Sequence, residues 1–400
     1  MCFQKNLMQK AMSLQNLKMI RTVPDVQPAR LFVRKQRSRC IVTKQLMYGT
    51  HAIGEAAIQA GCTCYFGYPI TPQNELPEYM SGRLAEVKDG VFIQAESELA
   101  AINMVLGASV AGARAMTSSS SPGISLKQEC ISFLAGSELP AVIVNIVRGG
   151  PGLGNIAPAQ SDYFQATRGG GHGDYRTVVF APASVQEMAD MTYTAFDVAD
   201  NYRTPVLVMG DGMLGQIMEP VIIPKKKKKL PERKYALTGA KGRSGRLIKS
   251  LILDTKEMEA HNWKLMRKYQ RIALKETRFE SYLMEDADMA VIAYGTAARI
   301  AKGAIKRLRQ EDKNLKVGLI RPITLWPFPT KAIQDASKQT KDFFVFEMSA
   351  GQMIEDVRLA LEGSRPIHFY GRPGGIVPAP AELARSIARH YYQSKRKQKR

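Results

Sequence analysis

A carboxylate, a hydroxyl and a guanidinium stand just beyond three strand-like stretches of this sequence, where side chains could meet around one ligand. Glu98 follows the stretch Val91–Ala95 and leads into small and apolar residues, Leu-Ala-Ala-Ile-Asn-Met-Val-Leu-Gly-Ala. A carboxylate in such surroundings loses much of its water and needs a specific hydrogen-bond donor. These surroundings suit a carboxyl group that meets a nitrogen atom of a bound molecule.

Thr71 is the hydroxyl, and it lies between Pro69 and Pro72 in the stretch FGYPITPQNELPEYM. Proline fixes φ and cannot donate a backbone hydrogen bond, so we expect a stiff turn around Thr71. Thr followed by Pro is also a good helix start, with Thr71 as N-cap and Pro72 as the first helical residue. A helix N-terminus at a ligand-binding edge also offers donors to a carboxylate or a phosphate. Both interpretations of Thr71 are open from spacing alone.

Arg148 is the guanidinium, and it ends the continuous apolar stretch Ala141–Val147. A glycine-rich turn at 149–154 follows it, so little side-chain bulk would separate Arg148 from a ligand. An arginine in this position is a natural clamp for a carboxylate.

Two further loops contain candidate residues. The run Ser118–Ser121 before Pro122-Gly123 predicts either a plain flexible loop or hydroxyl and N–H groups at the head of a helix. His172 stands between glycines in a second loop and is a candidate acid or base. A purely structural loop histidine is an equal alternative.

These loops need a scaffold, and strand-like and helix-like stretches alternate from Lys44 onward. Such alternation predicts an α/β fold, a doubly wound parallel sheet whose ligands bind beyond the carboxyl ends of its strands. We expect the first domain over 44–215, a basic connecting arm over 216–285 and a second, smaller α/β domain over 286–392. A basic N-terminal extension, 1–43, and a basic tail, 393–400, flank them, and the extension is expected to be disordered.

The net charge of +21 on 400 residues is concentrated outside this body. Residues 1–44 carry ten Lys or Arg and one acid, and five more basic residues stand both in Lys225–Lys229 and in Lys395–Arg400. Basic chain ends are more often solvated tails than segments that bind nucleic acid, and the sequence shows no nucleic-acid-binding motif. We therefore expect no nucleic acid as partner. The role of Lys225–Lys229 stays open, with a solvated linker favoured over a docking site for an acidic protein.

The five cysteines form no CxxC pair, and Cys62 and Cys64 read as small buried thiols of a protein in a reducing compartment. No apolar run reaches the length of a membrane span, so we expect a cytoplasmic protein without a membrane partner.

Gly210-Asp-Gly212 resembles the start of the thiamine diphosphate signature, in which an Asn some residues later completes a magnesium site. The next Asn here is Asn262, which is far too distant. If thiamine diphosphate binds, another chain must hold its diphosphate and Mg²⁺, and we expect no metal site in this one.

Several motifs together resemble the 2-oxoacid:ferredoxin oxidoreductases, in particular the subunit that carries the thiamine-pyrimidine domain. They are GYPITPQNELPEYM, QAESELAAINMVLGAS, TSSSSPGISLKQE, NIVRGGPGLGN, QATRGGGHGDYR, VGLIRPITLWPFP and FYGRPGG. The likeness runs from about Lys44 to Tyr392 and leaves out parts of the arm. It implies a thiamine diphosphate pyrimidine-binding domain followed by a domain like the C-terminal domain of transketolase.

The resemblance also implies roles for the candidate residues. Glu98 would hydrogen-bond N1′ of the aminopyrimidine and so promote loss of the C2 proton of the thiazolium. Thr71 and Arg148 would hold the carboxylate and carbonyl of a 2-oxo acid. Ser120, Pro122 and Gly123 would lie against the cofactor.

Partners are implied as well, because this chain has no iron–sulfur cysteines. A catalytic subunit with thiamine diphosphate and iron–sulfur clusters and a gamma-type subunit would complete the enzyme. Coenzyme A would take the acyl group, and ferredoxin would take the electrons.

Two types of 2-oxo acid are candidates for the substrate. No cation stands between Arg148 and Asp162, and Leu153 and Ile156 suit an apolar tail, which favours 3-methyl-2-oxobutanoate (2-oxoisovalerate). Arg168 keeps 2-oxoglutarate open as an alternative, because a folded loop could return its charge to the pocket.

Two other classes of protein remain as alternatives. A transketolase-like enzyme would normally carry the magnesium motif in the same chain. A non-catalytic scaffold would have no need for Glu98 beside Thr71 and Arg148.

Overall fold

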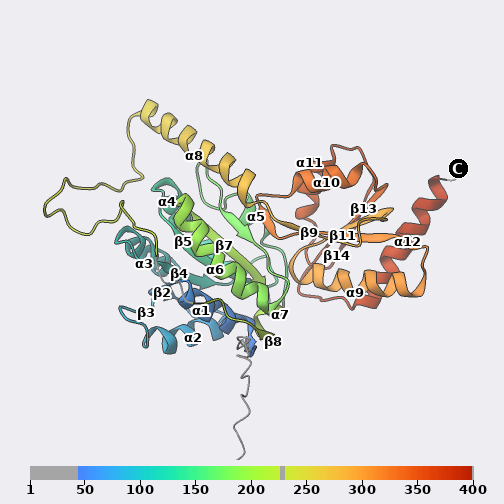
Figure 1. Ribbon diagram of the computed structural model, residues 1–400, viewed down its shortest axis with the longest axis horizontal. Helices are drawn as coiled ribbons and strands as arrows, with labels where there is room; N and C mark the ends of the chain where they lie inside the picture. Colours follow the sequence, from blue (N-terminus) through green and yellow to red (C-terminus); the bar gives the residue numbers. More distant parts are fainter. Residues whose placement is uncertain (1–43, 226–229, 399–400) are drawn as a thin grey trace, which may run out of the picture. The chain divides into compact units, whose positions relative to one another are not determined.

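The computed structural model describes residues 44–225 and 230–398; residues 1–43, 226–229 and 399–400 lie outside the described part. The expected N-terminal extension and most of the lysine run therefore fall outside it. Within the described part, strands and helices alternate along the chain and build two large sheets (Figure 1).

The first sheet has seven strands in the order β12-β6-β7-β5-β4-β2-β3. Every neighbouring pair is parallel except β12 with β6. The central strand β5 reads AVIVNIV, and all seven residues are buried, as expected where helices cover both faces of a parallel sheet. The bounds are β2 Cys64–Gly67, β3 Val91–Gln94, β4 Ala115–Ser119, β5 Ala141–Val147, β6 Val178–Phe180, β7 Pro205–Asp211 and β12 Thr324–Trp326.

Seven helices accompany this sheet, and α6 illustrates how the sequence sets their ends. Ser184 accepts a hydrogen bond from the backbone N–H of Glu187, so it caps the first turn, and Arg203 ends the helix in the left-handed region at φ 49°. The bounds are α1 Gly49–Gln59, α2 Glu75–Leu84, α3 Glu98–Val110, α4 Ser121–Gly136, α5 Tyr163–Thr167, α6 Val185–Tyr202 and α7 Gly212–Gln216.

The second sheet has five strands in the order β14-β13-β10-β11-β9, all parallel except β9 with β11. Buried apolar residues of β10, β11 and β13 pack with those of α9 and α12 in one cluster. The strands are β9 Phe279–Tyr282, β10 Met289–Ile292, β11 Val317–Pro322, β13 Asp342–Glu347 and β14 Ile367–Gly371; the helices are α9 Gly295–Glu311, α10 Thr330–Ser337, α11 Met353–Leu361 and α12 Pro380–Gln398.

These observations confirm the expected fold class, a doubly wound parallel sheet with a second, smaller α/β domain. Strand β12, which follows β11 of the second sheet, pairs with β6 of the first, so the two sheets share one stretch of chain. In the described ranges, no helix combines the length and apolar character that crossing a membrane requires.

The segment between the sheets is tied to the first one at several points. Its strand β8 (Met218–Val221) pairs antiparallel with β1 (Gln45–Tyr48). Residues 230–254 form a loop that leads into helix α8 (Thr255–Glu276), on which Leu265, Tyr269 and Ile272 form a buried stripe. Asp254 caps this helix by accepting the N–H of Glu257 at 2.8 Å.

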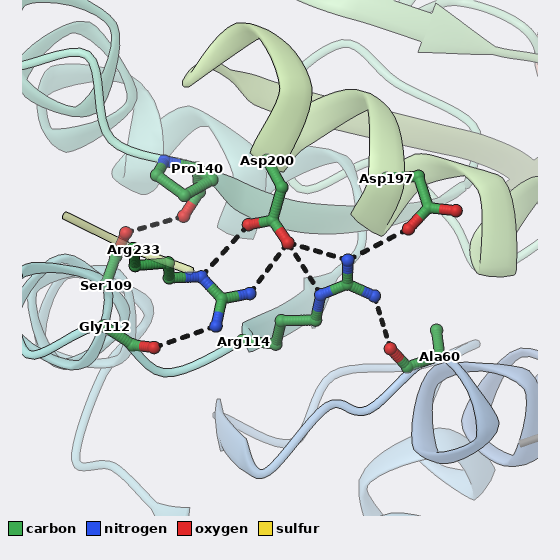
Figure 2. Close-up of polar contacts among 8 residues, drawn as sticks. All are labelled: Ala60, Ser109, Gly112, Arg114, Pro140, Asp197, Asp200 and Arg233. Carbon is green, nitrogen blue, oxygen red and sulfur yellow. Dashed lines mark hydrogen bonds and ion pairs between the residues drawn. The ribbon is translucent and has the colours of Figure 1, made fainter. Parts of the chain in front are cut away.

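Arg233 anchors the loop through an ion-pair cluster that Figure 2 shows. The carboxylate of Asp200 lies between two guanidinium groups, 2.7 Å from Arg114 Nη2 and 2.7 Å from Arg233 Nη2. Arg114 also binds Asp197 and the carbonyl of Ala60. The side chains of Asp200 and Arg114 are 6% and 1% exposed. Asp200 therefore neutralises guanidinium charge at a position that is largely shielded from solvent.

Candidate active site

The sheet topology brings the candidate residues to one edge. Strands β5, β4, β2 and β3 are parallel neighbours in that order, so the loops that follow them lie side by side. Thr71 follows β2, Glu98 follows β3, Ser120 follows β4 and Arg148 follows β5. The chain passes from β3 on one side of β2 to β4 on the other, and such a reversal of strand order is where open α/β sheets bind ligands.

Arg148 and Thr71 are in direct contact. Arg148 Nη1 donates to the carbonyl oxygen of Thr71 at 2.9 Å, and Nη2 donates to that of Leu153 at 3.0 Å. The side chain is buried, and Nε has no hydrogen-bond partner within the described residues. Two backbone carbonyls thus fix the guanidinium, and one N–H donor is left over.

Thr71 does not cap a helix, so that interpretation of the sequence is wrong. Helix α2 begins at Glu75, its N-cap is Asn74, and no side chain caps it. Thr71 lies earlier, in a turn held by the hydrogen bond from the N–H of Gln73 to the carbonyl of Ile70. The turn therefore holds Thr71 in place and does not begin a helix.

Glu98 is the first residue of α3, and its side chain is 6% exposed. Gly123, in the first turn of α4, lies directly against it. A Cβ atom at Gly123 would stand 2.5 Å from Glu98 Oε1 and 2.0 Å from Ser119 Oγ, so no larger residue fits. The missing Cβ leaves the carboxylate beside the N-terminus of α4, where backbone N–H groups favour negative charge.

The serine run is not a flexible loop. Ser118 and Ser119 end strand β4, Ser121 begins α4, and Ser118, Ser119 and Ser120 are fully buried. The Oγ atoms of Ser119 and Ser120 are buried without a hydrogen-bond partner in the described part of the chain. With Pro122 in the first turn of α4, these residues sit where the alternative of a helix head places them.

Asn145 and Asp162, which were not predicted as site residues, support this edge together with Ser121. Asn145, in the middle of β5, accepts the N–H of Ser121 at 3.2 Å and donates to Asp162 Oδ2 at 2.9 Å. Ser121 Oγ accepts the N–H of Arg148 at 3.1 Å. Burial raises the pKa of Asp162. The signal was present in the sequence as a lone amide inside an apolar strand.

His172 lies elsewhere. Its ring is 3.4 Å from Ser132 Oγ and packs edge-on against Phe133, both in the last turns of α4. It lines a cavity of about 410 Å³ together with Met258 and His261 of α8. The structure thus does not bring His172 to Glu98, Thr71 and Arg148.

The other motifs have structural tasks. Asp211 caps α7 by accepting the N–H groups of Met213 and Leu214 at 3.0 and 3.1 Å, and burial raises its pKa. Cys62 and Cys64 are buried free thiols, as predicted, and burial raises the pKa of Cys62 to about 12. Over residues 44–225 and 230–398, no three His, Cys, Asp or Glu side chains come together as a metal site would require.

Comparison with known proteins now adds to this geometry. Residues 55–283 match the family described as "Pyruvate flavodoxin/ferredoxin oxidoreductase, thiamine diP-bdg". The chain belongs to the 2-oxoacid:ferredoxin oxidoreductase family. Residues 287–383 match the pyruvate:ferredoxin oxidoreductase core domain II. The sequence-based recognition of this oxidoreductase family, and of the subunit with its thiamine diphosphate domain, is confirmed.

Relatives within the 2-oxoacid:ferredoxin oxidoreductase family are similar over nearly their whole length. The ketoisovalerate oxidoreductase subunit VorB of Methanothermobacter thermautotrophicus is 50% identical over 332 residues, which cover 83% of this chain and 93% of VorB. The 2-oxoglutarate synthase subunit KorA of the same organism is 35% identical over 367 residues, 85% of this chain and 96% of KorA.

A solved structure of the same family agrees with the fold. The 2-oxoglutarate:ferredoxin oxidoreductase from Magnetococcus marinus, solved with 2-oxoglutarate, coenzyme A and succinyl-CoA bound, superposes with a TM-score of 0.78 at 29% identity. The match covers 86% of this chain and 65% of that one. VorB and KorA are subunits of such enzymes, and this chain is likewise one subunit of a multi-subunit oxidoreductase.

Proposed function

We propose that this chain is the pyrimidine-binding subunit of an enzyme that oxidatively decarboxylates 3-methyl-2-oxobutanoate. One 2-oxo acid and coenzyme A give the acyl-CoA, CO₂ and a proton, and two electrons pass to two molecules of ferredoxin. The observation that carries the proposal is the buried Glu98 carboxylate against Gly123, on the same sheet edge as the Arg148–Thr71 pair.

The residues at this edge fit thiamine diphosphate. A carboxylate at Glu98 is the group that an aminopyrimidine nitrogen requires, and the missing Cβ of Gly123 leaves room beside it. The unpartnered Oγ atoms of Ser119 and Ser120 are buried hydroxyls of the kind a bound heterocycle satisfies. When bound, thiamine diphosphate supplies the nucleophilic carbon and the electron sink for decarboxylation.

The residues of this chain would orient the reactants. Glu98 would hold a proton on N1′ of the pyrimidine, and Ser120, Pro122 and Gly123 would lie against the ring. Arg148, with its spare Nε donor, would bind the carboxylate of the 2-oxo acid, and Thr71 would position its carbonyl. Because two backbone carbonyls fix the guanidinium, little reorganisation is needed when the substrate arrives.

The charges around this edge suit a 2-oxo acid whose own side chain is branched and apolar. The cavity of about 440 Å³ between Pro122, Gly150, Gln352 and Gly374 has no Lys or Arg in its lining. Arg168, the residue that kept 2-oxoglutarate open, donates to Asp356 Oδ1 at 3.0 Å and lies over the Phe164 ring. Among the described residues, a second carboxylate would thus find no unpaired cation in this cavity. The 50% identity to a ketoisovalerate oxidoreductase subunit points the same way.

Another subunit should complete the site. Helix α3 is apolar almost all round, yet Leu99 is 44% exposed and the stripe of Leu99, Asn103 and Gly107 faces outward. A helix of this kind is normally covered on every side. We infer that a partner with thiamine diphosphate and iron–sulfur clusters packs on it and holds the diphosphate and Mg²⁺. A gamma-type subunit and ferredoxin complete the assembly in the cytoplasm.

Replacing Gly107 by Arg should block this assembly without harming the fold of the chain. A Cβ atom at Gly107 meets nothing within 4 Å, and Arg forms helices better than Gly. A charge buried in the subunit interface without a partner should cost roughly 2–5 kcal/mol of association free energy. Co-purification with the partner subunit and thermal unfolding of the chain alone measure the two effects.

The matched control is Gly82→Arg, at an exposed glycine of α2 whose Cβ also meets nothing within 4 Å. It should bind the partner as the unaltered chain does. Equal binding by both variants would show that the outer face of α3 is not an interface.

Anaerobic reduction of a viologen dye tests the proposed function itself. The chain, purified together with its partner subunits, should reduce the dye only when 3-methyl-2-oxobutanoate, coenzyme A and thiamine diphosphate are all present. Dye reduction that needs no coenzyme A, or formation of a ketol from a sugar phosphate instead, would favour the transketolase-like alternative.

A further inference from the structure

Lys127 contacts the backbone of Glu98 and is completely buried. It belongs to α4, six residues after the serine that begins the helix, and its side chain has no solvent exposure. Its ammonium donates to two atoms, the backbone carbonyl oxygen of Glu98 at 3.2 Å and Thr117 Oγ1 at 3.1 Å. One side chain of α4 thereby joins the first residue of α3 to strand β4.

A buried ammonium is costly unless a negative group balances it. Burial lowers the pKa of Lys127, and the negative charge of Glu98 counteracts this in part, which leaves a pKa of about 8. The other titratable group that acts on Lys127 is Cys130, one turn along α4, whose thiol has its pKa raised to about 12 by burial. Cys130 is therefore neutral over the working range. Glu98 is the negative group that favours the charged lysine, although the ammonium contacts its backbone carbonyl and not its carboxylate.

We propose that Lys127 is a positioning residue for Glu98, holding the start of α3 against β4 and balancing the carboxylate charge while that carboxylate serves the cofactor. This inference rests on the proposed function of Glu98. Lys127 touches no substrate and acts through Glu98 alone. Helix packing by itself would need only an apolar side chain of similar length, so the proposal concerns the ammonium group.

The test replaces Lys127 by Met in the assembled enzyme, because Met has a similar volume and no charge. We expect kcat to fall about 10²-fold, the effect of a slightly misplaced catalytic group, while KM for the 2-oxo acid stays within about twofold. With a pKa of about 8, the ammonium of Lys127 should lose its charge as the pH rises through this value. Any fall in kcat near this pH should therefore disappear in Lys127→Met. An unchanged kcat, or a loss of stability with the pH profile intact, would overturn the proposal.

A double-mutant comparison separates this inference from the proposed function. If Lys127 acts through Glu98, Lys127→Met should cost about 10²-fold in the unaltered enzyme and less than about twofold in a Glu98→Gln background. An equal loss in both backgrounds would overturn the role of Lys127. If Glu98→Gln alone leaves kcat unchanged, the proposed function of Glu98 has failed instead.

Thr117→Val provides a second variant for the case that Lys127→Met does not assemble. It keeps the lysine charge and nearly the same volume but removes one of the two acceptors. We expect a several-fold fall in kcat, and slower exchange of the C2 hydrogen of bound thiamine diphosphate in D₂O, on the order of the fall in kcat. An exchange rate equal to that of the unaltered enzyme would contradict the positioning role.

Discussion

Replacing Glu98 by Gln in the assembled enzyme should lower kcat by about 10²–10⁴-fold, the usual contribution of a positioned acid–base group. The variant keeps the size and shape of the side chain but loses the negative charge. A neutral Gln amide cannot hold a proton on N1′ as a carboxylate does. Dye reduction with saturating 2-oxo acid measures the effect.

Glu96→Gln is the matched control, since Glu96 precedes the same helix and is exposed. Its kcat should stay close to that of the unaltered enzyme. Full activity of Glu98→Gln in a complex that has assembled normally would mean that another residue serves the pyrimidine.

Replacing Asp200 by Ala should destabilise the chain by about 3–5 kcal/mol, the cost of removing one partner from a buried ion pair. Asp200 neutralises both Arg114 and Arg233, and the side chain of Arg114 is 1% exposed (Figure 2). Both guanidinium groups would lose a carboxylate at once, and the loop that Arg233 anchors would lose a tie to α6. Urea unfolding followed by circular dichroism measures the change.

Glu311→Ala is the control for this experiment. Its ion pair with Arg307 joins two side chains that are both about half exposed, so little stability should be lost. An effect of Asp200→Ala no larger than that of the control would show that the cluster contributes little to the fold.

Local patterns predicted the scaffold well because the two sheets depend on strongly apolar strands. The stretch Ala141–Val147 was predicted with the bounds that β5 has, since six apolar residues around a single amide are typical of a strand that is covered on both faces. Three edge strands of the two sheets, β9, β12 and β14, were not predicted. The residues of β9 alternate between exposed and half-buried, and all five residues of β14 are half-buried, so neither strand shows a strong apolar pattern. The short β12 pairs with β6, which lies far away in the sequence, and local periodicity cannot indicate such a pairing.

The common edge of the candidate residues could be predicted because each of them follows a parallel strand, and their roles at that edge stay predictions. Glu98, Thr71 and Arg148 reach one edge because β3, β2 and β5 are parallel members of one sheet. The N-cap interpretation of Thr71 was wrong because the turn runs on to Asn74 before the helix begins.

What the sequence did not reveal is contact between segments. Three such contacts are those of Gly123 with Glu98, of Lys127 with the carbonyl of Glu98, and of Arg168 with Asp356. All three depend on how segments that are distant in the sequence pack together. Leu153 and Ile156 were expected to suit an apolar substrate tail, yet they are 81% and 62% exposed in this chain. We propose that they contribute to the pocket only when the partner subunit covers them.

The most direct test of the whole account is the relative kcat/KM of the assembled enzyme for 3-methyl-2-oxobutanoate, pyruvate and 2-oxoglutarate, measured anaerobically with coenzyme A and a viologen dye. Among the described residues, no Lys or Arg lines the cavity at Pro122 and Gly150, and Arg168 is paired with Asp356. We therefore expect 3-methyl-2-oxobutanoate to be preferred over 2-oxoglutarate by at least about 10²-fold, since a second carboxylate would be left unpaired. A higher kcat/KM for 2-oxoglutarate would contradict the proposed substrate and would require a cation that another subunit supplies.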